Sequence, residues 1–219
     1  MKTAITIIVI IIIVALGFFY ATRAPSVPTV DVNTVTGTST ISNELITYRI
    51  AQASSTVEFR IGEILNDEPN QAIGVTNQVA GDIYISTSSI NIGTIAVNAR
   101  TFKTDSERRD GAIARFILKS ENPAYEFIYF RPTTVTGAPS SISPGSEFNL
   151  TATGDLTVAG VTKPATFNIV MTINENSISG TATLPMKRSD YNLAIPSVRS
   201  VASVDENFVV VANIVAERQ

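Results

Sequence analysis

The 219-residue chain contains no cysteine and no histidine. Without cysteine it can form no disulfide, offers no thiol nucleophile and cannot carry a lipid on an N-terminal cysteine. Without either residue it lacks the side chains that usually bind zinc, and it cannot build a Ser-His-Asp triad. An enzyme that works with carboxylates or lysine stays open, but the acidic residues fall mostly on polar strand positions or in turns. We therefore predict neither an enzyme nor a metal site.

Charge is also scarce. Charged residues make up 16% of the chain, the formal net charge is −3, and no basic run exists. Nucleic-acid binding needs a cationic surface, so nucleic acid is not expected as a partner. Apolar residues make up 44% of the chain, which is enough for a full core. Threonine, serine and valine are common, as is typical of strands with one face in water.

A long apolar run opens the chain. From Ala4 to Tyr20 it is broken only by Thr6 and Gly17, and as a helix it would span about 25 Å, the short end of a bilayer crossing. We expect residues 1–21 to form an uncleaved transmembrane signal anchor, with the domain that follows on the extracytoplasmic side. The alternative is a signal peptide cleaved near residues 22–24, which would leave a secreted or periplasmic protein.

A polar, proline-containing stretch follows the apolar run. Residues 22–43 are rich in Thr, Ser, Val and Pro and have no helical periodicity. They predict an extended stalk between the membrane and the domain. An added edge strand within Val27–Val35 is the alternative. The sequence thus divides into an anchor (1–21), a stalk (22–43) and a domain (44–219).

The domain has a hydrophobic period of two, which predicts strands with one apolar and one polar face. In residues 146–158, Phe148, Leu150, Ala152 and Leu156 share one face, and polar residues occupy the other. The same pattern marks 56–63, 165–173 and 177–186. Further strands are expected at 45–53, 79–86, 92–102, 124–131 and 206–217. The stretch 66–78 is interpreted as a loop.

One segment breaks this period. Thr104 and Glu107 have the spacing of a helix capping box, and Ile113, Phe116 and Ile117 follow at helical spacing. We predict a short helix over 106–118. About eight long antiparallel strands with one inserted helix favour a closed β-barrel, because closure removes exposed edges. A two-sheet sandwich has the same period and is the alternative.

Strand length favours the barrel over the sandwich. Residues 146–173 predict two strands of about a dozen residues joined at Ala159-Gly160, longer than the usual strand of about five or six residues. Long, tilted strands are typical of a barrel with an inner cavity.

A family resemblance runs through the same residues. The stretch Gly154–Phe167 (GDLTVAGVTKPATF) resembles the most distinctive run of the YceI-like family. Other pieces are similar in order: Ser55–Phe59, Gly81–Ile83, Arg109-Asp110, Asn122–Phe127, Asp190–Leu193 and Val204-Asp205. Together they cover residues 45–217. Many members carry a histidine after the second strand, where this chain has Glu63, so a head-group role tied to that histidine does not transfer.

The resemblance implies a lipocalin-like, eight-stranded antiparallel barrel in an extracytoplasmic location. It also implies that the lumen holds a long isoprenoid chain, such as a polyprenyl quinone or polyprenyl phosphate. No other cofactor is expected, and the sequence does not indicate an oligomeric state.

The candidate ligand-binding residues are the large apolar side chains of one strand face, with one arginine at the start of the helix for a polar head group. They are Phe59, Ile61, Phe127, Tyr129, Phe148, Leu150, Leu156, Phe167, Ile169, Met171 and Arg108. The alternative is that these side chains fill the interior completely. The chain would then be a packed structural or interaction domain displayed on a stalk, with no ligand cavity.

Overall fold

The structure is a computed structural model, and it describes residues 29–36, 45–197 and 201–219. The predicted membrane anchor, residues 1–21, lies outside the described residues, and so does most of the predicted stalk. Within the described part of the chain, no helix is both long and apolar enough to cross a membrane.

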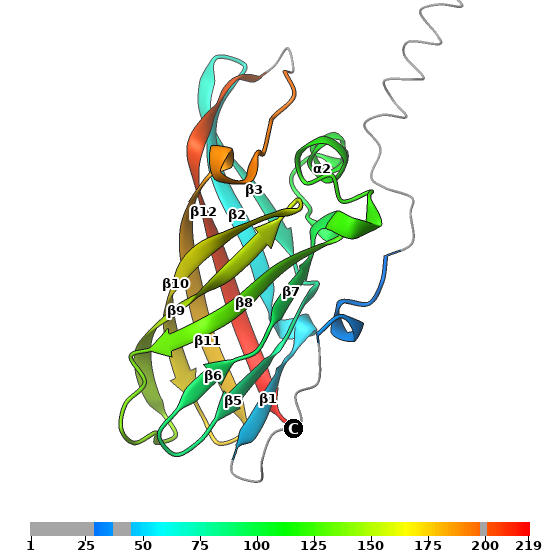
Figure 1. Ribbon diagram of the computed structural model, residues 1–219. Helices are drawn as coiled ribbons and strands as arrows, with labels where there is room; N and C mark the ends of the chain where they lie inside the picture. Colours follow the sequence, from blue (N-terminus) through cyan, green and yellow to red (C-terminus); the bar gives the residue numbers. More distant parts are fainter. Residues whose placement is uncertain (1–28, 37–44, 198–200) are drawn as a thin grey trace, which may run out of the picture.

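The described residues form twelve strand segments in a single antiparallel sheet that curls around an interior (Figure 1). The segments are β1 Ile46–Ile50, β2 Thr56–Leu65, β3 Glu68–Thr76, β4 Val79–Ala80, β5 Asp82–Ile85, β6 Ile90–Ile92, β7 Ile95–Asn98, β8 Phe127–Thr136, β9 Ser146–Val158, β10 Val161–Ile173, β11 Ser177–Lys187 and β12 Val201–Arg218. The prediction of an all-β domain is confirmed.

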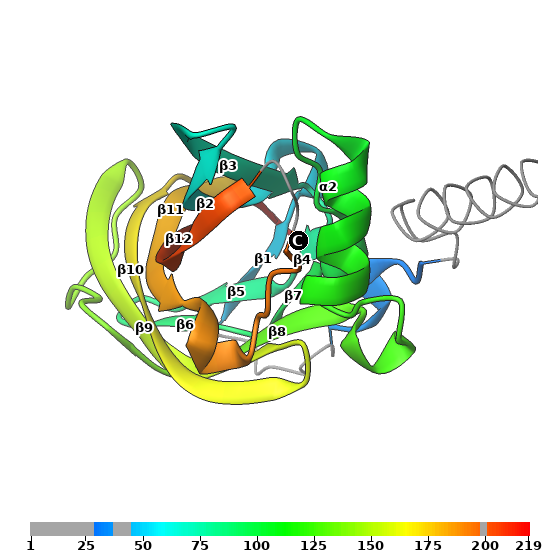
Figure 2. The same ribbon diagram turned by 90° about the horizontal axis from the view of Figure 1, so that it is seen from above.

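Hydrogen-bonded pairs join all twelve strand segments into the one sheet. From β8 to β12 each strand pairs with the next one in sequence. Strand β12 also pairs with both β1 and β2. Strand β1 pairs in turn with β5, and β2 pairs with β3. Strand β5 pairs with β6, and β4 pairs with β7. Strand β7 pairs with β8 as well. Seen from above, the sheet surrounds an interior with helix α2 beside it (Figure 2). A sandwich would need two separate sheets, whereas the described strands form one.

The longest hairpin has the predicted form. Strands β9 and β10 pair residue by residue from Val158 opposite Val161 to Ser146 opposite Ile173. The two turn residues, Ala159 (φ 48°) and Gly160 (φ 81°), both have positive φ. That is the requirement of a two-residue type I′ turn, whose twist matches that of the strands it joins.

The predicted helix is also present, with a different start. Helix α2 (Glu107–Ala112) continues as a π-helical turn, η4 (Ile113–Ile117). Its N-cap is Ser106, whose hydroxyl accepts a hydrogen bond from the Arg109 amide, so the capping box at Thr104 does not form. The short 3-10 turns are η1 Val32–Thr34, η2 Gln52–Ser54, η3 Ala99–Thr101, η5 Pro123–Tyr125 and η6 Arg188–Tyr191.

The prediction of a loop over residues 66–78 is wrong, because β3 occupies most of it. Strand β3 pairs with β2 from Leu65 opposite Glu68 to Val57 opposite Thr76. Its first four residues are exposed. At this tip of the hairpin neither face of β3 packs against the core. Apolar and polar residues therefore do not alternate where the strand begins.

The stalk prediction does not hold for residues 29–36, which we call the strap. They lie against the outer face of the curled sheet, and Val32 is fully buried there with Ala80, Ala96 and Phe127. The strap contains η1 and no strand, so the alternative of an added edge strand is not seen in these residues either.

The backbones of β8 and β9 approach each other closely at Gly154. A Cβ atom on Gly154 would lie 2.6 Å from the Cα of Pro132 and would overlap the carbonyl of Arg131. The β8–β9 register shifts at this point. We expect Gly154→Ala to lower the free energy of unfolding by about 1–3 kcal/mol, the usual cost of overpacking. Urea unfolding measures it, with Thr153→Ala on the exposed face as the control; equal effects would contradict the account.

Candidate functional site

A cavity of about 850 Å³ lies inside the curled sheet. All twelve described strands contribute residues to its wall, together with α2 and η4. The volume falls within the range of roughly 300–1,000 Å³ that is typical of small-molecule sites. The prediction of a hollow interior is confirmed, and the alternative of a packed domain without a cavity is contradicted.

Small side chains in the wall help to explain why the interior is hollow. Gly180 and Ala182 lie on the inward row of β11, and Ala212 lies on β12 directly opposite Ala182. Large side chains at these positions would project into the space. An apolar space of this size cannot satisfy the hydrogen bonds of many waters, so it favours an apolar occupant.

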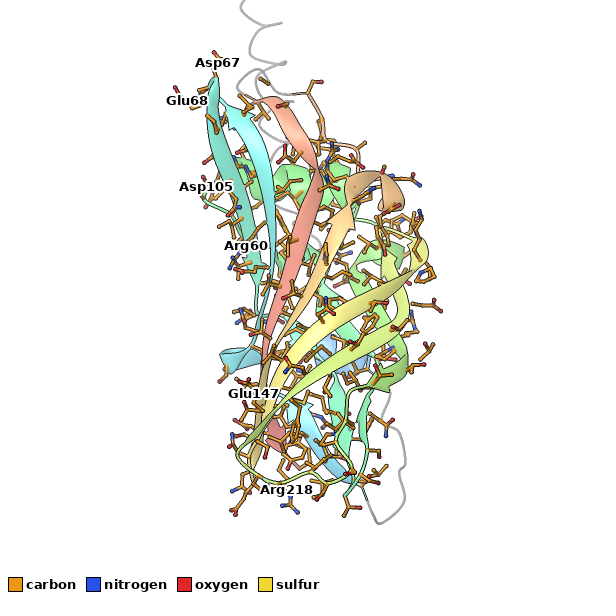
Figure 3. All side chains as sticks on the ribbon, turned by 90° about the vertical axis from the view of Figure 1, so that its left-hand side faces the viewer. Arg60, Asp67, Glu68, Asp105, Glu147 and Arg218 are labelled. Atoms are coloured by element: carbon orange, nitrogen blue, oxygen red, sulfur yellow. The ribbon has the colours of Figure 1, made fainter. Side chains whose placement is uncertain are left out.

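Among the described residues, the exposed ones that line the cavity all lie at one end. We call this end the mouth; it is bounded by α2, η6 and residues 193–197. The β2–β3 turn, with Asp67 and Glu68, lies at this end, and Arg218 lies at the opposite end (Figure 3). Toward the opposite end the cavity wall is formed by Ile83 and Ile178, which are both buried.

Seven of the eleven predicted site residues line the cavity: Phe59, Ile61, Leu156, Phe167, Ile169, Met171 and Arg108. Two more, Phe148 and Leu150, belong to the same hydrophobic core without lining the cavity. In the core, the Phe130 and Phe167 rings meet edge to face with their centroids 4.7 Å apart. The rows on β2 and β10 therefore face inward, as predicted.

The remaining two, Phe127 and Tyr129, were predicted to face inward, and the structure places them on the outer face of β8. They pack there with Val32 of the strap, and burial raises the pKa of the Tyr129 phenol. Ile128 and Phe130 line the cavity in their place. Because the strap covers the outer face, β8 is apolar on both faces, and its alternation does not reveal which side is inside.

A buried carboxylate points inward near the mouth. Glu63 continues the inward row of β2, and its side chain is 5% exposed. It accepts hydrogen bonds from Arg109 Nη2 and Asn70 Nδ2, each at 2.8 Å. Arg109 also pairs with Asp105 at 2.8 Å. These contacts fasten α2 to β2 beside the opening.

The charges of the cavity wall are balanced. The charged residues that line it are Glu58, Glu63, Asp105, Arg108, Arg109 and Arg188. Arg188 donates to the carbonyl of Asp205 at 2.7 Å and pairs with Glu206 at 3.4 Å. The mouth is therefore polar at its rim without being a cationic site.

The carboxylates in this wall are all engaged by arginine. Glu58 pairs with Arg60, while Glu63 and Asp105 share Arg109. Among the described residues, no group of three acidic side chains is placed to hold a metal ion. The geometry at the mouth is that of a structural charge network.

A single curled antiparallel sheet around an apolar cavity, with one short helix at its mouth, defines the class: a lipocalin-like β fold with an internal hydrophobic site. The particular family follows from the sequence match. The model of the YceI-like domain matches residues 48–216, and the chain belongs to that family.

Two solved structures illustrate the likeness of fold. One is a polyisoprenoid-binding domain from Saccharophagus degradans implicated in plant cell wall breakdown, 14% identical, with a TM-score of 0.61 over 78% of this chain and 98% of that one. The other is BcnA from Burkholderia cenocepacia, 15% identical, with a TM-score of 0.60 over 76% and 98%. No curated protein matches the chain.

Proposed function

We propose that this chain is a binding protein that holds a long-chain isoprenoid, or a similar lipid, in its cavity and catalyses no reaction. The observation that carries the proposal is the apolar cavity of about 850 Å³ with a single polar end. Each CH₂ group removed from water contributes about 0.8 kcal/mol, so a long chain gains enough to offset its immobilisation. The polyisoprenoid-binding relative supports the choice of lipid.

The twelve strand segments can be grouped into the eight strands of a closed barrel. Strands β1 and β2 both pair with β12 and count as one strand interrupted by η2. In the same way β3, β4 and β5 join as one strand, and β6 and β7 as another. With β8 to β12 this gives eight, a number that leaves a lumen just wide enough for side chains or one small ligand.

The proposal places the barrel outside the cell on an N-terminal membrane anchor. Its support is the apolar run of residues 4–20, which is long enough for a short bilayer crossing. Flotation of the full chain with membranes, and protease access to the domain from the outside only, test this placement.

The charges at the mouth favour an uncharged head group, such as a quinone or an alcohol. A phosphate is held by cationic groups in excess, often by bidentate arginine. Here three acidic and three basic residues line the cavity, and the Glu63 carboxylate among them is 5% exposed. A phosphate entering the mouth would meet that carboxylate. Arg108, at the rim in the first turn of α2, is placed to contact the polar head.

The test is chemical and begins with the purified full chain. We expect organic extraction followed by mass spectrometry to find a co-purified long-chain lipid. In competition, a prenyl quinone or prenol is expected to bind several-fold more tightly than the prenyl phosphate of equal length. Absence of bound lipid together with no binding of any of the three probes would refute lipid binding, and tighter binding of the phosphate would refute the head-group assignment.

A further inference from the structure

The strap is hydrogen-bonded to a buried carboxylate of the barrel. Thr29 Oγ1 and the Val30 amide both donate to Glu126 Oε1, at 2.5 and 2.8 Å. Asn98 Nδ2 donates a hydrogen bond to the Thr29 hydroxyl. The other carboxylate oxygen of Glu126 is held by Arg100 at 3.2 Å, with both side chains about 5% exposed or less. The strap therefore lies against a buried ion pair of the barrel.

Apolar contact holds the next part of the strap. Val32 is fully buried, while Val30, two residues earlier, is 48% exposed. The partners of Val32 are Ala80, Ala96 and Phe127 on β4, β7 and β8. The family match begins at residue 48, so this fastening is an addition to the matched domain.

The strap shortens the tether between the domain and the predicted anchor. If residues 22–43 all formed the stalk, they could span roughly 75 Å at about 3.3–3.6 Å per residue. With Thr29 fixed to the barrel, only residues 22–28 remain, a reach of roughly 25 Å. Strand β9 alone, with 13 residues, is roughly 43 Å long. The tether is therefore shorter than the barrel strands, which keeps the barrel beside the bilayer.

The mouth carries the apolar group suited to meet that bilayer. Phe116 on η4 lines the cavity and is nevertheless 41% exposed. In Figure 1 the strap lies on the side of the barrel below α2, and Glu126, which it contacts, directly follows η5, whereas β1 begins at the end of the barrel opposite α2. Helices that lie on a membrane surface place Phe, Trp and Leu side chains at the boundary between headgroups and acyl chains.

We propose that the strap holds the barrel with its mouth against the lipid bilayer, so that a lipid passes between the bilayer and the cavity with little exposure to water. The partner of the mouth surface is the bilayer itself, contacted by Phe116. This inference rests on the proposed lipid-binding function for its purpose, but its geometry can be measured on its own.

The absence of native cysteine makes single labels unambiguous. Ser197→Cys places a bimane label at the mouth and leaves Phe116 in place, and Glu175→Cys places one in the β10–β11 turn at the opposite end. The full-length chain is reconstituted in phosphatidylcholine vesicles that contain brominated lipid. We expect severalfold stronger quenching at position 197 than at position 175. Equal quenching at both positions, or failure of the chain to float with the vesicles, would overturn the proposal.

The strap is tested by matched substitutions in the labelled Ser197→Cys background. Val32→Asp puts a charge into the buried pocket and is expected to reduce the quenching strongly, with the milder Val32→Ser as a second variant. Val30→Ser makes the same change as Val32→Ser at a side chain that is 48% exposed, and it keeps the backbone amide that donates to Glu126, so it is expected to leave quenching unchanged. Unchanged quenching in both Val32 variants would overturn the role of the strap.

A lipid measurement separates the two proposals. Extracts of Val32→Asp are expected to contain as much lipid as the wild type, because Val32 does not line the cavity. Transfer of a prenyl quinone from vesicles into the barrel is expected to slow several-fold in this variant. Absence of lipid from every variant and no binding of the three added probes, with asymmetric quenching retained, would refute the proposed function and leave the orientation standing. Unchanged transfer would overturn the role of the orientation in lipid exchange.

Discussion

Replacing Ala182 with phenylalanine is expected to expel the lipid while the barrel stays folded. Ala182 lines the cavity on β11 and faces Ala212 on β12. A benzyl group there occupies space that the lipid chain would otherwise fill. Displacing only two CH₂ groups from the wall costs about 1.6 kcal/mol, so affinity is expected to fall about tenfold or more. Titration with a prenyl quinone measures the loss.

Thr183→Phe is the matched control for this substitution. It adds an aromatic ring to the next residue of the same strand, on the outer face. We expect wild-type affinity for Thr183→Phe, and a free energy of unfolding near that of the wild type for both variants. Retention of full affinity in Ala182→Phe would show that the lipid does not occupy the cavity.

Arg100→Met is expected to lower the free energy of unfolding by about 3–5 kcal/mol, the usual cost of leaving one partner of a buried ion pair uncompensated. The Glu126 carboxylate would lose its cation while 5% exposed. The carbonyl oxygens of Ser120 and Glu121 would each lose a donor as well. Chemical denaturation of the full chain, followed by circular dichroism, measures the effect.

Two controls identify the cause of that loss. Arg60→Met removes a cation of similar size from an exposed pair with Glu58, and it is expected to cost about 1 kcal/mol or less. Adding Glu126→Gln to Arg100→Met removes the stranded charge, and it is expected to restore part of the stability. A cost of Arg100→Met as small as that of Arg60→Met would contradict the description of this pair.

Much of the fold could be predicted from the sequence because one face of most strands meets the core and the other meets water. The long pair β9 and β10 and the helix near residue 107 follow from such local patterns. The inward rows of β2 and β10 follow for the same reason. Where both faces are buried, as in β8 beneath the strap, the pattern does not distinguish inside from outside, and Phe127 and Tyr129 were assigned to the wrong side.

The cavity and the strap needed three-dimensional information. Alternation shows which row faces inward, but whether that row fills the interior depends on residues that meet across the sheet, such as Ala182 and Ala212. The row of small residues on β11 was the available signal. The strap is recognised only through Glu126, some 97 residues away, which no local pattern links to Thr29. Glu63 was noted as a departure from the family, but its ion pair with Arg109 was not foreseen.

The most direct test of the central claim is native mass spectrometry of the intact chain, released from detergent and titrated with a prenyl quinone. We expect a single added mass, one lipid per chain, in the wild type and in Thr183→Phe, and none in Ala182→Phe at the same concentration. A spectrum that shows only the unliganded chain, or equal lipid occupancy in the wild type and Ala182→Phe, would contradict the account.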